Sequence, residues 1–371
     1  MKKTPILLAV ALGCLLGMDF LSGGMLQQML AAPVTPVVRR RVRHSRRRRV
    51  RRRRNPWRIS SYDRHPGEGD NTEGEDLAVR QAALQALGHL NGSVVVVDPN
   101  DGRVLTVVNQ KLAFSGAFRP CSTFKPIVAL AALKQGIISP RTRIYVGHHR
   151  TMDLTDALAH SNNQFFYKLG RMVGFRLLAR YAHEFGLGQK AGLDIPEDLP
   201  GEFPTAAPND YEVGYLAYLG KGIEVTPLQW AAVASAIANG GTLYYLQYPR
   251  TREQVENFRP KVRRKLANLR KEIPEVRAGM AAAVSYGTAR QASDGAVEIL
   301  GKTGSCTEGG ARLGWFLSYS GTRPQYVVVV LLRGGWPING PRAAEIAGRL
   351  YRGLQPGIPN EIQEIKTAAG E

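Results

Sequence analysis

Three short stretches decide the fold of this chain: RPCSTFKP at 119–126, AHSNNQFFYKLG at 159–170 and ILGKTGSCTEGGARLGWFLSYS at 299–320. In the first, Ser122 and Lys125 stand three residues apart where an apolar run with helical spacing begins, so their side chains share one face. A serine hydroxyl is a poor nucleophile until a base takes its proton, and a lysine is such a base only when its pKa is lowered. The pair is a candidate acylation site.

The other two stretches carry further polar groups. Ser161 and Asn163 precede a second apolar helical run, while Lys302 and Thr303 end a strand-like run in which Gly304 leaves room for a ligand against the backbone. Alone, each also fits a structural role, such as a helix cap or an exposed lysine. Ser-x-Asn follows Ser-x-x-Lys by 39 residues and Lys-Thr-Gly follows by 141 more. This order indicates one composite site.

The surrounding pattern predicts one α+β domain from Leu77 to Leu354, without internal repeats. Two β-branched runs flank a turn at 100–102, and three strand-like runs come late. Two early strands, three late strands and helices between them predict an antiparallel sheet from both chain ends, flanked by helices, with a helical subdomain between. The expected helices cover 77–90, 123–135, 227–239 and 341–350, and the late strands cover 297–303, 312–320 and 326–332.

The positive charge of the chain is concentrated near its N-terminus. Of the net +20, residues 1–60 carry +14, mostly from twelve arginines between Arg39 and Arg54. The rest has no Lys/Arg stripe and no zinc-finger, KH or RRM signature, which argues against nucleic-acid binding by the folded domain. Three cysteines are too few for a disulfide scaffold and fit no zinc motif, so no metal or cofactor is expected.

Residues 1–32 predict export to the cell membrane or the periplasm. Two lysines precede an uncharged apolar run from Thr4 to Met18, as in a signal peptide. The apolar character resumes at Met25, so a cleaved signal peptide and an uncleaved membrane anchor both remain open.

Two further segments are expected to lie outside the core. Residues 33–76 have almost no large apolar side chains and predict an Arg-rich disordered linker. Its arginines Arg39–Arg54 fit either an anionic surface or a solvated spacer. Residues 355–371 are expected to form a C-terminal tail.

With its three motifs in this order, the sequence resembles the penicillin-binding proteins, the serine D,D-transpeptidases of cell-wall synthesis. The resemblance covers roughly 77–354 and includes GKGIEVTPLQWAAVASAIANGG at 220–241 and DLPGE at 198–202. It implies a β-lactamase/transpeptidase-like fold of class B-like type. No pedestal or glycosyltransferase domain is expected, because neither fits in the 76 residues upstream.

The resemblance implies a role for each catalytic residue. Ser122 is the acylated nucleophile and Lys125 its general base. Ser161 relays the proton to the leaving D-alanine amine or β-lactam nitrogen, and Asn163 holds Lys125 and the substrate amide. The implied partners are peptidoglycan stem peptides ending in D-Ala-D-Ala, and β-lactam antibiotics.

The same resemblance assigns substrate binding to the Lys-Thr-Gly strand. Lys302 and Thr303 bind the terminal carboxylate beside Gly304, and the backbone N–H groups of Ser122 and Ser305 form the oxyanion hole. The segment Tyr286–Thr288 and Trp315 are expected to pack in the core.

Both cysteines of the folded domain depart from the usual family pattern. Cys121 stands where glycine is common, and Ser305-Cys306 replaces the common Thr-Ala. In this assignment the cysteines flank the two oxyanion-hole residues, which brings their Cα atoms near the distance range of a disulfide. A disulfide and two free buried thiols both remain open.

Other functions compete with the transpeptidase. A D,D-carboxypeptidase uses water as the acceptor and the same motifs. A serine β-lactamase needs a water-activating group, and the Glu-x-x-Leu-Asn string of class A enzymes does not occur. The acidic loop of Asp194, Glu197, Asp198 and Glu202 leaves that alternative open. A β-lactam sensor requires a transducing domain, for which the sequence gives no sign.

Overall fold

The computed structural model describes residues 57–293, 295, 297–321 and 324–355. All belong to the second of two compact units, Arg54–Glu371. The expected leader at 1–32, the run Arg39–Arg54 and the tail beyond Gln355 lie outside the described residues. Within the described part, no helix is both long enough and apolar enough to span a bilayer.

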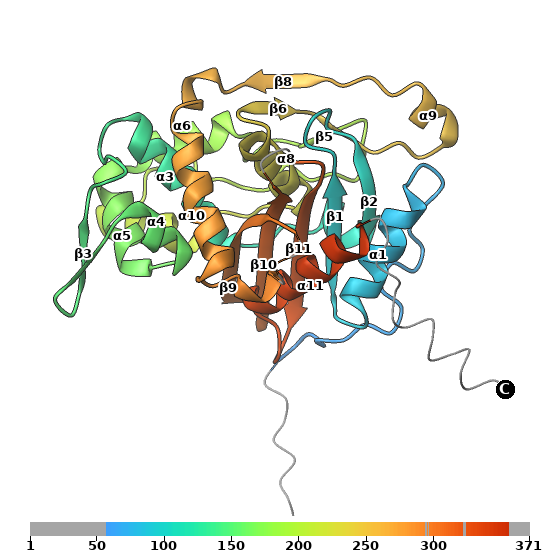
Figure 1. Cartoon of the computed structure of the whole chain (residues 1–371), viewed down its shortest axis with the longest axis horizontal. Coiled ribbons are helices and arrows are strands. Elements are labelled where there is room, and N and C mark those ends of the chain that lie inside the picture. The colour runs from blue at the N-terminus through green and yellow to red at the C-terminus, as the bar shows by residue number, and fades with distance from the viewer. Residues whose placement is uncertain (1–56, 294, 296, 322–323, 356–371) are drawn as a thin grey trace, which may run out of the picture. The chain divides into compact units, whose positions relative to one another are not determined.

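A five-stranded antiparallel sheet forms the centre of the domain (Figure 1). Its strand order is β2-β1-β11-β10-β9, so early strands pair with late ones, and Val94 lies opposite Val330. This confirms the prediction of a sheet built from both chain ends. The strands are β1 (Gly92–Val97), β2 (Val104–Val108), β9 (Ile299–Glu308), β10 (Ala311–Ser320) and β11 (Val327–Gly334).

Both faces of the sheet are covered, which explains its nearly continuous β-branched strands. Val94 and Val96 enter one core cluster, while Val95 and Val97 enter the other. Successive side chains of a strand point to opposite faces, so an all-valine strand can serve two cores. Helices α1 (Leu77–Leu87) and α11 (Gly340–Gly353) contribute to the first cluster, and α8 (Pro227–Ala238) to the second.

The helix α8 begins as the sequence predicts. The Thr226 hydroxyl accepts a hydrogen bond from Gln229 N, and the Gln229 side chain accepts one from Thr226 N. This capping box fixes the first turn, and Pro227 occupies a position that needs no amide hydrogen. All twelve residues of α8 are buried.

A mainly helical region lies beside the β9 edge of the sheet, and its helix α10 contacts both β9 and α4 (Figure 1). Its elements are η1 (Cys121–Phe124), α3 (Lys125–Lys134), β3 (Ile144–Gly147), β4 (Arg150–Met152), α4 (Leu154–Ala159), α5 (Asn163–Val173), α6 (Phe175–Glu184), α7 (Asp210–Leu219) and α10 (Ile273–Ser285). The remaining elements are α2 (Gln110–Ser115), β5 (Gly192–Leu193), β6 (Thr242–Tyr244), β7 (Leu246–Gln247), α9 (Arg252–Glu256), β8 (Val262–Lys265), η2 (Ala267–Leu269) and η3 (Arg290–Ala292).

The linker prediction is wrong for residues 57–76, which pack on the domain. The Asp70 carboxylate pairs with Arg80 at 2.9 Å and accepts hydrogen bonds from Asn109 N and Gln110 N. The Ser61 carbonyl accepts from Asn91 N at 2.9 Å. The segment has only a few large apolar residues, among them Trp57 and Ile59, and these polar contacts and backbone hydrogen bonds help to hold it on the domain.

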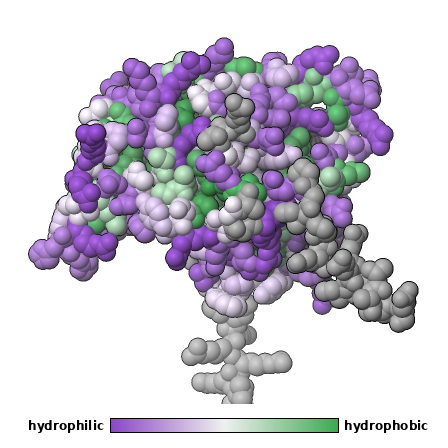
Figure 2. All heavy atoms as spheres, viewed as in Figure 1, coloured by the Kyte–Doolittle hydropathy of each residue, from purple (hydrophilic) through white to green (hydrophobic). Residues whose placement is uncertain are grey.

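The face of the domain seen in Figure 2 is mostly hydrophilic, with small separate hydrophobic areas. Several large apolar side chains are nonetheless exposed, Trp336 by 74% and Leu77 by 63%. Isolated residues of this kind are common on soluble domains.

Candidate active site

Ser122 lies in the single-turn helix η1, directly before α3. The η1 and α3 segments are continuous, and Lys125 is the first residue of α3, one turn after Ser122. The Ser122 hydroxyl donates a hydrogen bond to the Tyr218 carbonyl at 3.4 Å, which ties this turn to the end of α7. The predicted side-by-side placement of Ser122 and Lys125 is therefore set by local helix geometry.

Lys125 is fully buried and held by the Ser-x-Asn motif. Its Nζ donates to Ser161 O at 2.6 Å, Ser161 Oγ at 3.1 Å and Asn163 Oδ1 at 2.8 Å. Burial lowers the pKa of Lys125 well below its ordinary value, and the charge of Lys302 lowers it further. A buried lysine made neutral in this way can accept a proton from a nearby hydroxyl.

The backbone at Ser161 is left-handed, with a φ of 53°. This conformation is uncommon for a residue other than glycine, and it places both oxygens of Ser161 on Lys125 Nζ. The Ser-x-Asn motif thus forms a turn around the lysine. The following Asn162 caps α5 by accepting a hydrogen bond from Phe165 N.

Strand β9 brings the third motif to the same site. Lys302 is fully buried, and its Nζ donates to the Thr303 carbonyl at 3.0 Å. Burial lowers the pKa of Lys302 to about 7. Because Lys302 and Lys125 lie in one buried site, the charge of Lys302 disfavours the charged form of Lys125.

Thr303 has a partner that the sequence analysis assigned to the core. Its hydroxyl lies 2.6 Å from the hydroxyl of Thr288, and Thr288 N donates to Ala159 O at 3.0 Å. Thr288 therefore connects the Lys-Thr-Gly strand with the end of α4, just before Ser161. The sequence signal that could have revealed this role is the string YGT, in which Thr288 directly follows a glycine.

Gly304 lies where β9 passes closest to η1, the turn that contains Ser122. A Cβ at this position would lie 3.0 Å from Pro120 O and 3.1 Å from Thr123 Cγ2. The next residue, Ser305, is exposed, and its Oγ accepts a hydrogen bond from Gly340 N at 2.7 Å. The strand thus runs so close to η1 that any larger residue at position 304 would have to push the two segments slightly apart.

A disulfide joins the same two elements. Cys121 and Cys306 are bonded in the structure, with their Cα atoms 5.7 Å apart. Cys121 is fully buried and has a left-handed φ of 54°. A left-handed backbone favours glycine, which gives a physical reason for the glycine common at this position in the family.

The expectations for other residues near the motifs need one correction. Trp315 is fully buried, as expected, and its Nε1 donates to Arg119 O at 2.9 Å. Tyr286 is not a core residue, because its side chain is 45% exposed and its hydroxyl donates to Asp156. Tyr286 stands at the C-cap of α10, and its ring lies 5.6 Å from the ring of His160.

The acidic loop makes contacts of other kinds. Glu197 pairs with Arg250 at 2.7 Å, and Glu202 forms a backbone bridge with Glu224. Asp198 is buried and accepts a hydrogen bond from Gly192 N, and burial raises its pKa to about 6. These contacts account for three of the four acidic residues.

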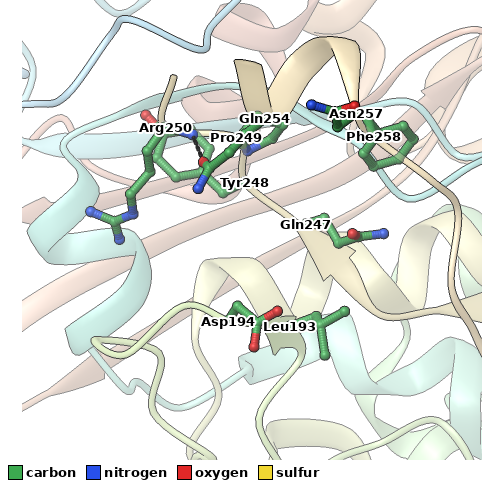
Figure 3. Close-up of a pocket in the computed structure, with 9 residues that line it drawn as sticks. All are labelled: Leu193, Asp194, Gln247, Tyr248, Pro249, Arg250, Gln254, Asn257 and Phe258. Carbon is green, nitrogen blue, oxygen red and sulfur yellow. Dashed lines mark hydrogen bonds between the residues drawn. The ribbon is translucent and has the colours of Figure 1, made fainter. Parts of the chain in front are cut away.

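The fourth residue, Asp194, lines a separate cavity of about 250 Å³ (Figure 3). Its other lining residues, which include Arg250 and Phe258, come from the strands and loops around β5, β7 and α9, outside the three motifs. Within the described ranges, no group of three His, Cys, Asp or Glu side chains gathers to hold a metal ion.

A serine one turn before a buried lysine, with a second buried lysine and a threonine on a nearby strand, is the arrangement expected of a site that transfers acyl groups through a serine ester. The family model described as the penicillin binding protein transpeptidase domain matches residues 92–352, and this chain belongs to that family. The resemblance stated from the motifs is confirmed.

Named relatives and solved structures agree with the family. The chain is 29% identical to Stage V sporulation protein D of Bacillus subtilis over 70% of its own length and 46% of that protein. It is 26% identical to the peptidoglycan D,D-transpeptidase MrdA of Haemophilus influenzae over 45% of its length and 34% of the relative. The chain thus spans less than half of these relatives.

The fold itself matches solved transpeptidase domains. The domain from penicillin-binding protein 3 of Burkholderia pseudomallei is similar with a TM-score of 0.66 and 20% identity, over 80% of this chain and all of that one. The D,D-transpeptidase domain from Eggerthella lenta gives a TM-score of 0.62, at 19% identity over 79% of this chain and 82% of that one. The predicted α+β transpeptidase-like fold is confirmed.

Proposed function

We propose that this chain is a peptidoglycan D,D-transpeptidase that is acylated at Ser122 by stem peptides ending in D-Ala-D-Ala, and by β-lactams. The observation that carries the proposal is the environment of Lys125. It is fully buried one turn after Ser122, and its Nζ is held by both oxygens of Ser161 and by Asn163 Oδ1. A neutral lysine in this position is the general base that the serine requires.

The acylation step follows from this arrangement. Lys125 Nζ takes the Ser122 hydroxyl proton as Ser122 Oγ bonds to the substrate carbonyl carbon. When the C–N bond of the terminal D-alanine breaks, Ser161 Oγ passes a proton from Lys125 to the leaving amine. The acyl group then moves to the amine of a second peptide, whose lost proton returns to Ser122 Oγ.

The other motif residues bind the substrate in this proposal. Charged Lys302 attracts the terminal carboxylate, and the Thr303 hydroxyl donates to it. The backbone N–H groups of Ser122 and Ser305 stabilise the tetrahedral oxyanion, by roughly 3–4 kcal/mol per donor in comparable sites. Gly304 supports the proposal, because its missing Cβ allows β9 to approach the nucleophile turn.

Labelling with a fluorescent penicillin tests the proposal. Ser122→Ala should abolish the label, and Lys125→Ala should slow labelling by several orders of magnitude in a folded protein. Lys134→Ala, on the same helix and partly exposed, is the matched control. Labelling of Ser122→Ala at the wild-type rate, detected by intact mass, would rule out this nucleophile.

A chase experiment separates the competing functions. The penicilloyl enzyme should survive for minutes or longer, whereas many turnovers per second on a chromogenic cephalosporin would identify a β-lactamase. Reaction with a D-Ala-D-Ala peptide and an amine acceptor distinguishes a transpeptidase from a carboxypeptidase. A new amide product supports the transpeptidase, and release of D-alanine with hydrolysis alone identifies a carboxypeptidase.

We also propose that the domain acts outside the cytoplasm and that the N-terminus provides its export and membrane association. The apolar run within residues 1–32 supports this proposal, and Arg39–Arg54 suit an anionic surface. Deletion of these arginines should weaken salt-sensitive binding of the protein to isolated sacculi. Equal binding by the full-length and shortened chains at low salt would contradict the surface role.

A further inference from the structure

A second cavity, of about 380 Å³, lies directly beside the proposed active site. Four tyrosines and two side-chain amides form its wall, from helices α5 and α7: Asn163, Gln164, Tyr167, Tyr211, Tyr215 and Tyr218. The function proposed above uses only Asn163 among them.

Two residues of the cavity wall also contact the proposed catalytic pair. Asn163 lines it and also accepts a hydrogen bond from Lys125 Nζ at 2.8 Å. Tyr218 lines it as well, and its carbonyl accepts from Ser122 Oγ at 3.4 Å. A group bound in the cavity is therefore separated from Ser122 and Lys125 by a single layer of residues.

Reaction geometry decides which part of the substrate lies on this side. If Lys302 and Thr303 hold the terminal carboxylate, the leaving D-alanine lies toward β9. The attacking amine of the second peptide must enter where the leaving amine departs, by microscopic reversibility. The opposite side of Ser122, toward Asn163 and the tyrosines, is then left for the acyl part of the donor peptide.

The cavity wall has the chemistry of a cation-binding cage. The rings of Tyr211 and Tyr215 lie 5.0 Å apart between centroids, and the ring of Tyr167 lies 5.9 Å from each. The hydrogen bond with Tyr211 and, to a lesser extent, burial raise the pKa of Tyr215 to about 12. Its hydroxyl is therefore neutral at pH 7. Neutral aromatic faces attract an ammonium group.

Positive charges near the cavity are neutral or paired. Lys125, whose Nζ lies 2.8 Å from Asn163 Oδ1, is the neutral base of the proposed mechanism. The six lining residues include no lysine and no arginine. Arg171, whose guanidinium lies 5.7 Å from the Tyr167 ring, forms an ion pair with Asp210. Lys221 likewise pairs with Glu212 at 2.8 Å. The amide oxygens of Asn163 and Gln164 add hydrogen-bond acceptors.

We propose that the tyrosine-lined cavity binds the alkylammonium side chain of a diamino residue in the acyl-donor peptide, which makes it a specificity site for the donor strand. The inference rests on the proposed transpeptidase function, because it assumes that the donor is a peptide esterified to Ser122. The tyrosine faces bind the ammonium, and the rings pack on its methylene chain.

Three donor peptides test this site. They are Nα-acetyl-L-lysyl-D-alanyl-D-alanine, its Nε-acetyl derivative and the norleucine analogue, and the readout is kcat/KM for D-alanine release by the full chain. The wild type should prefer the free ammonium by about five- to tenfold. Tyr215→Leu should reduce this preference below twofold, and Tyr215→Phe should keep it because the ring remains.

Two further variants keep the test decisive. Tyr211→Leu should also lower the preference, and Tyr211 is 59% exposed, so its replacement leaves the core intact. Tyr145→Leu, which removes a 50% exposed tyrosine outside the cavity, should retain the wild-type preference.

The outcomes separate this inference from the proposed function. Equal rates for the three peptides, or an unchanged preference in Tyr215→Leu and Tyr211→Leu, would overturn the cavity assignment while D-alanine release still supports the transpeptidase. If no peptide releases D-alanine and penicillin does not label Ser122, the proposed function fails, and the donor-strand inference fails with it.

Discussion

The Thr288 hydroxyl lies 2.6 Å from the Thr303 hydroxyl, so the Lys-Thr-Gly strand is hydrogen-bonded to the segment that follows α10. Thr288 N also donates to Ala159 O, two residues before Ser161. One residue outside the three motifs thus links two of them. In the proposed mechanism, Thr288 positions the Thr303 hydroxyl for the substrate carboxylate.

Replacement of Thr288 should therefore slow acylation without removing a catalytic group. Thr288→Val keeps the shape but loses the hydroxyl, and we expect a rate of penicillin acylation about five- to tenfold lower, as for the loss of about 1 kcal/mol of hydrogen bonding. Thr288→Ser should restore most of the rate. Equal second-order rates for Thr288→Val and the wild type would remove the positioning role.

The buried Lys302 should make stability depend on pH. Its pKa is about 7 in the folded chain and about 10.4 when unfolded. Between these values the unfolded state holds a proton that the folded state has lost, so the free energy of unfolding rises with pH in this window. Below pH 7 both states are charged, and the full cost of burying the charge remains.

Lys302→Met should consequently stabilise the fold most below pH 7, with a gain that shrinks toward pH 10. Urea unfolding at pH 6, 8 and 10 measures it. The exposed Lys111→Met is the control and should show little change at any of the three. A gain that is the same at all three pH values would mean that burial of the charge is not its source.

The Cys121–Cys306 bond should stabilise the domain, since it closes a loop with a sequence separation of 185 residues. Loss of the bond in Cys121→Ala/Cys306→Ala is expected to cost about 2–4 kcal/mol, as for typical disulfides. Denaturant unfolding with and without dithiothreitol measures the effect. A wild-type stability that is insensitive to the reductant would contradict the prediction.

The left-handed φ of Cys121 gives a second, separable effect. Cys121→Gly/Cys306→Ala should be more stable than Cys121→Ala/Cys306→Ala by about 1 kcal/mol, because glycine adopts this backbone conformation without strain. Both double variants lack the disulfide, so the difference between their free energies of unfolding measures the backbone strain at position 121. Equal midpoints in the same denaturant would show that this turn relaxes when the bond is absent.

Gly304→Ala should affect the site more than the fold. The new Cβ would press on Pro120 O and Thr123 Cγ2 and push β9 away from η1 by a few tenths of an ångström. We expect penicillin acylation to slow about tenfold, because the two halves of the site move apart. Thr307→Ala, at an exposed position of the same strand, should acylate normally. Comparable rates for both variants would argue against a tight β9–η1 contact.

The sequence by itself determined the local features of this protein. Ser-x-x-Lys at a helix start places Ser122 and Lys125 one turn apart whatever surrounds them, and Thr226-Pro227 begins α8 as capping chemistry requires. The valine-rich runs of β1 and β11 likewise favour strands through their own β-branched residues. Short-range rules suffice there because each feature depends on neighbours within a few residues.

Only the tertiary structure decided which residues far apart in the sequence come into contact. The hydroxyl pair of Thr288 and Thr303, the tyrosine-lined cavity between α5 and α7 and the packing of residues 57–76 on the domain all join segments that no local pattern connects. The lowered pKa of Lys125 likewise arises from burial and from Lys302, which is 177 residues away in the chain. Desolvation and long-range contacts exist only once the chain has folded, so spacing in the sequence cannot specify them.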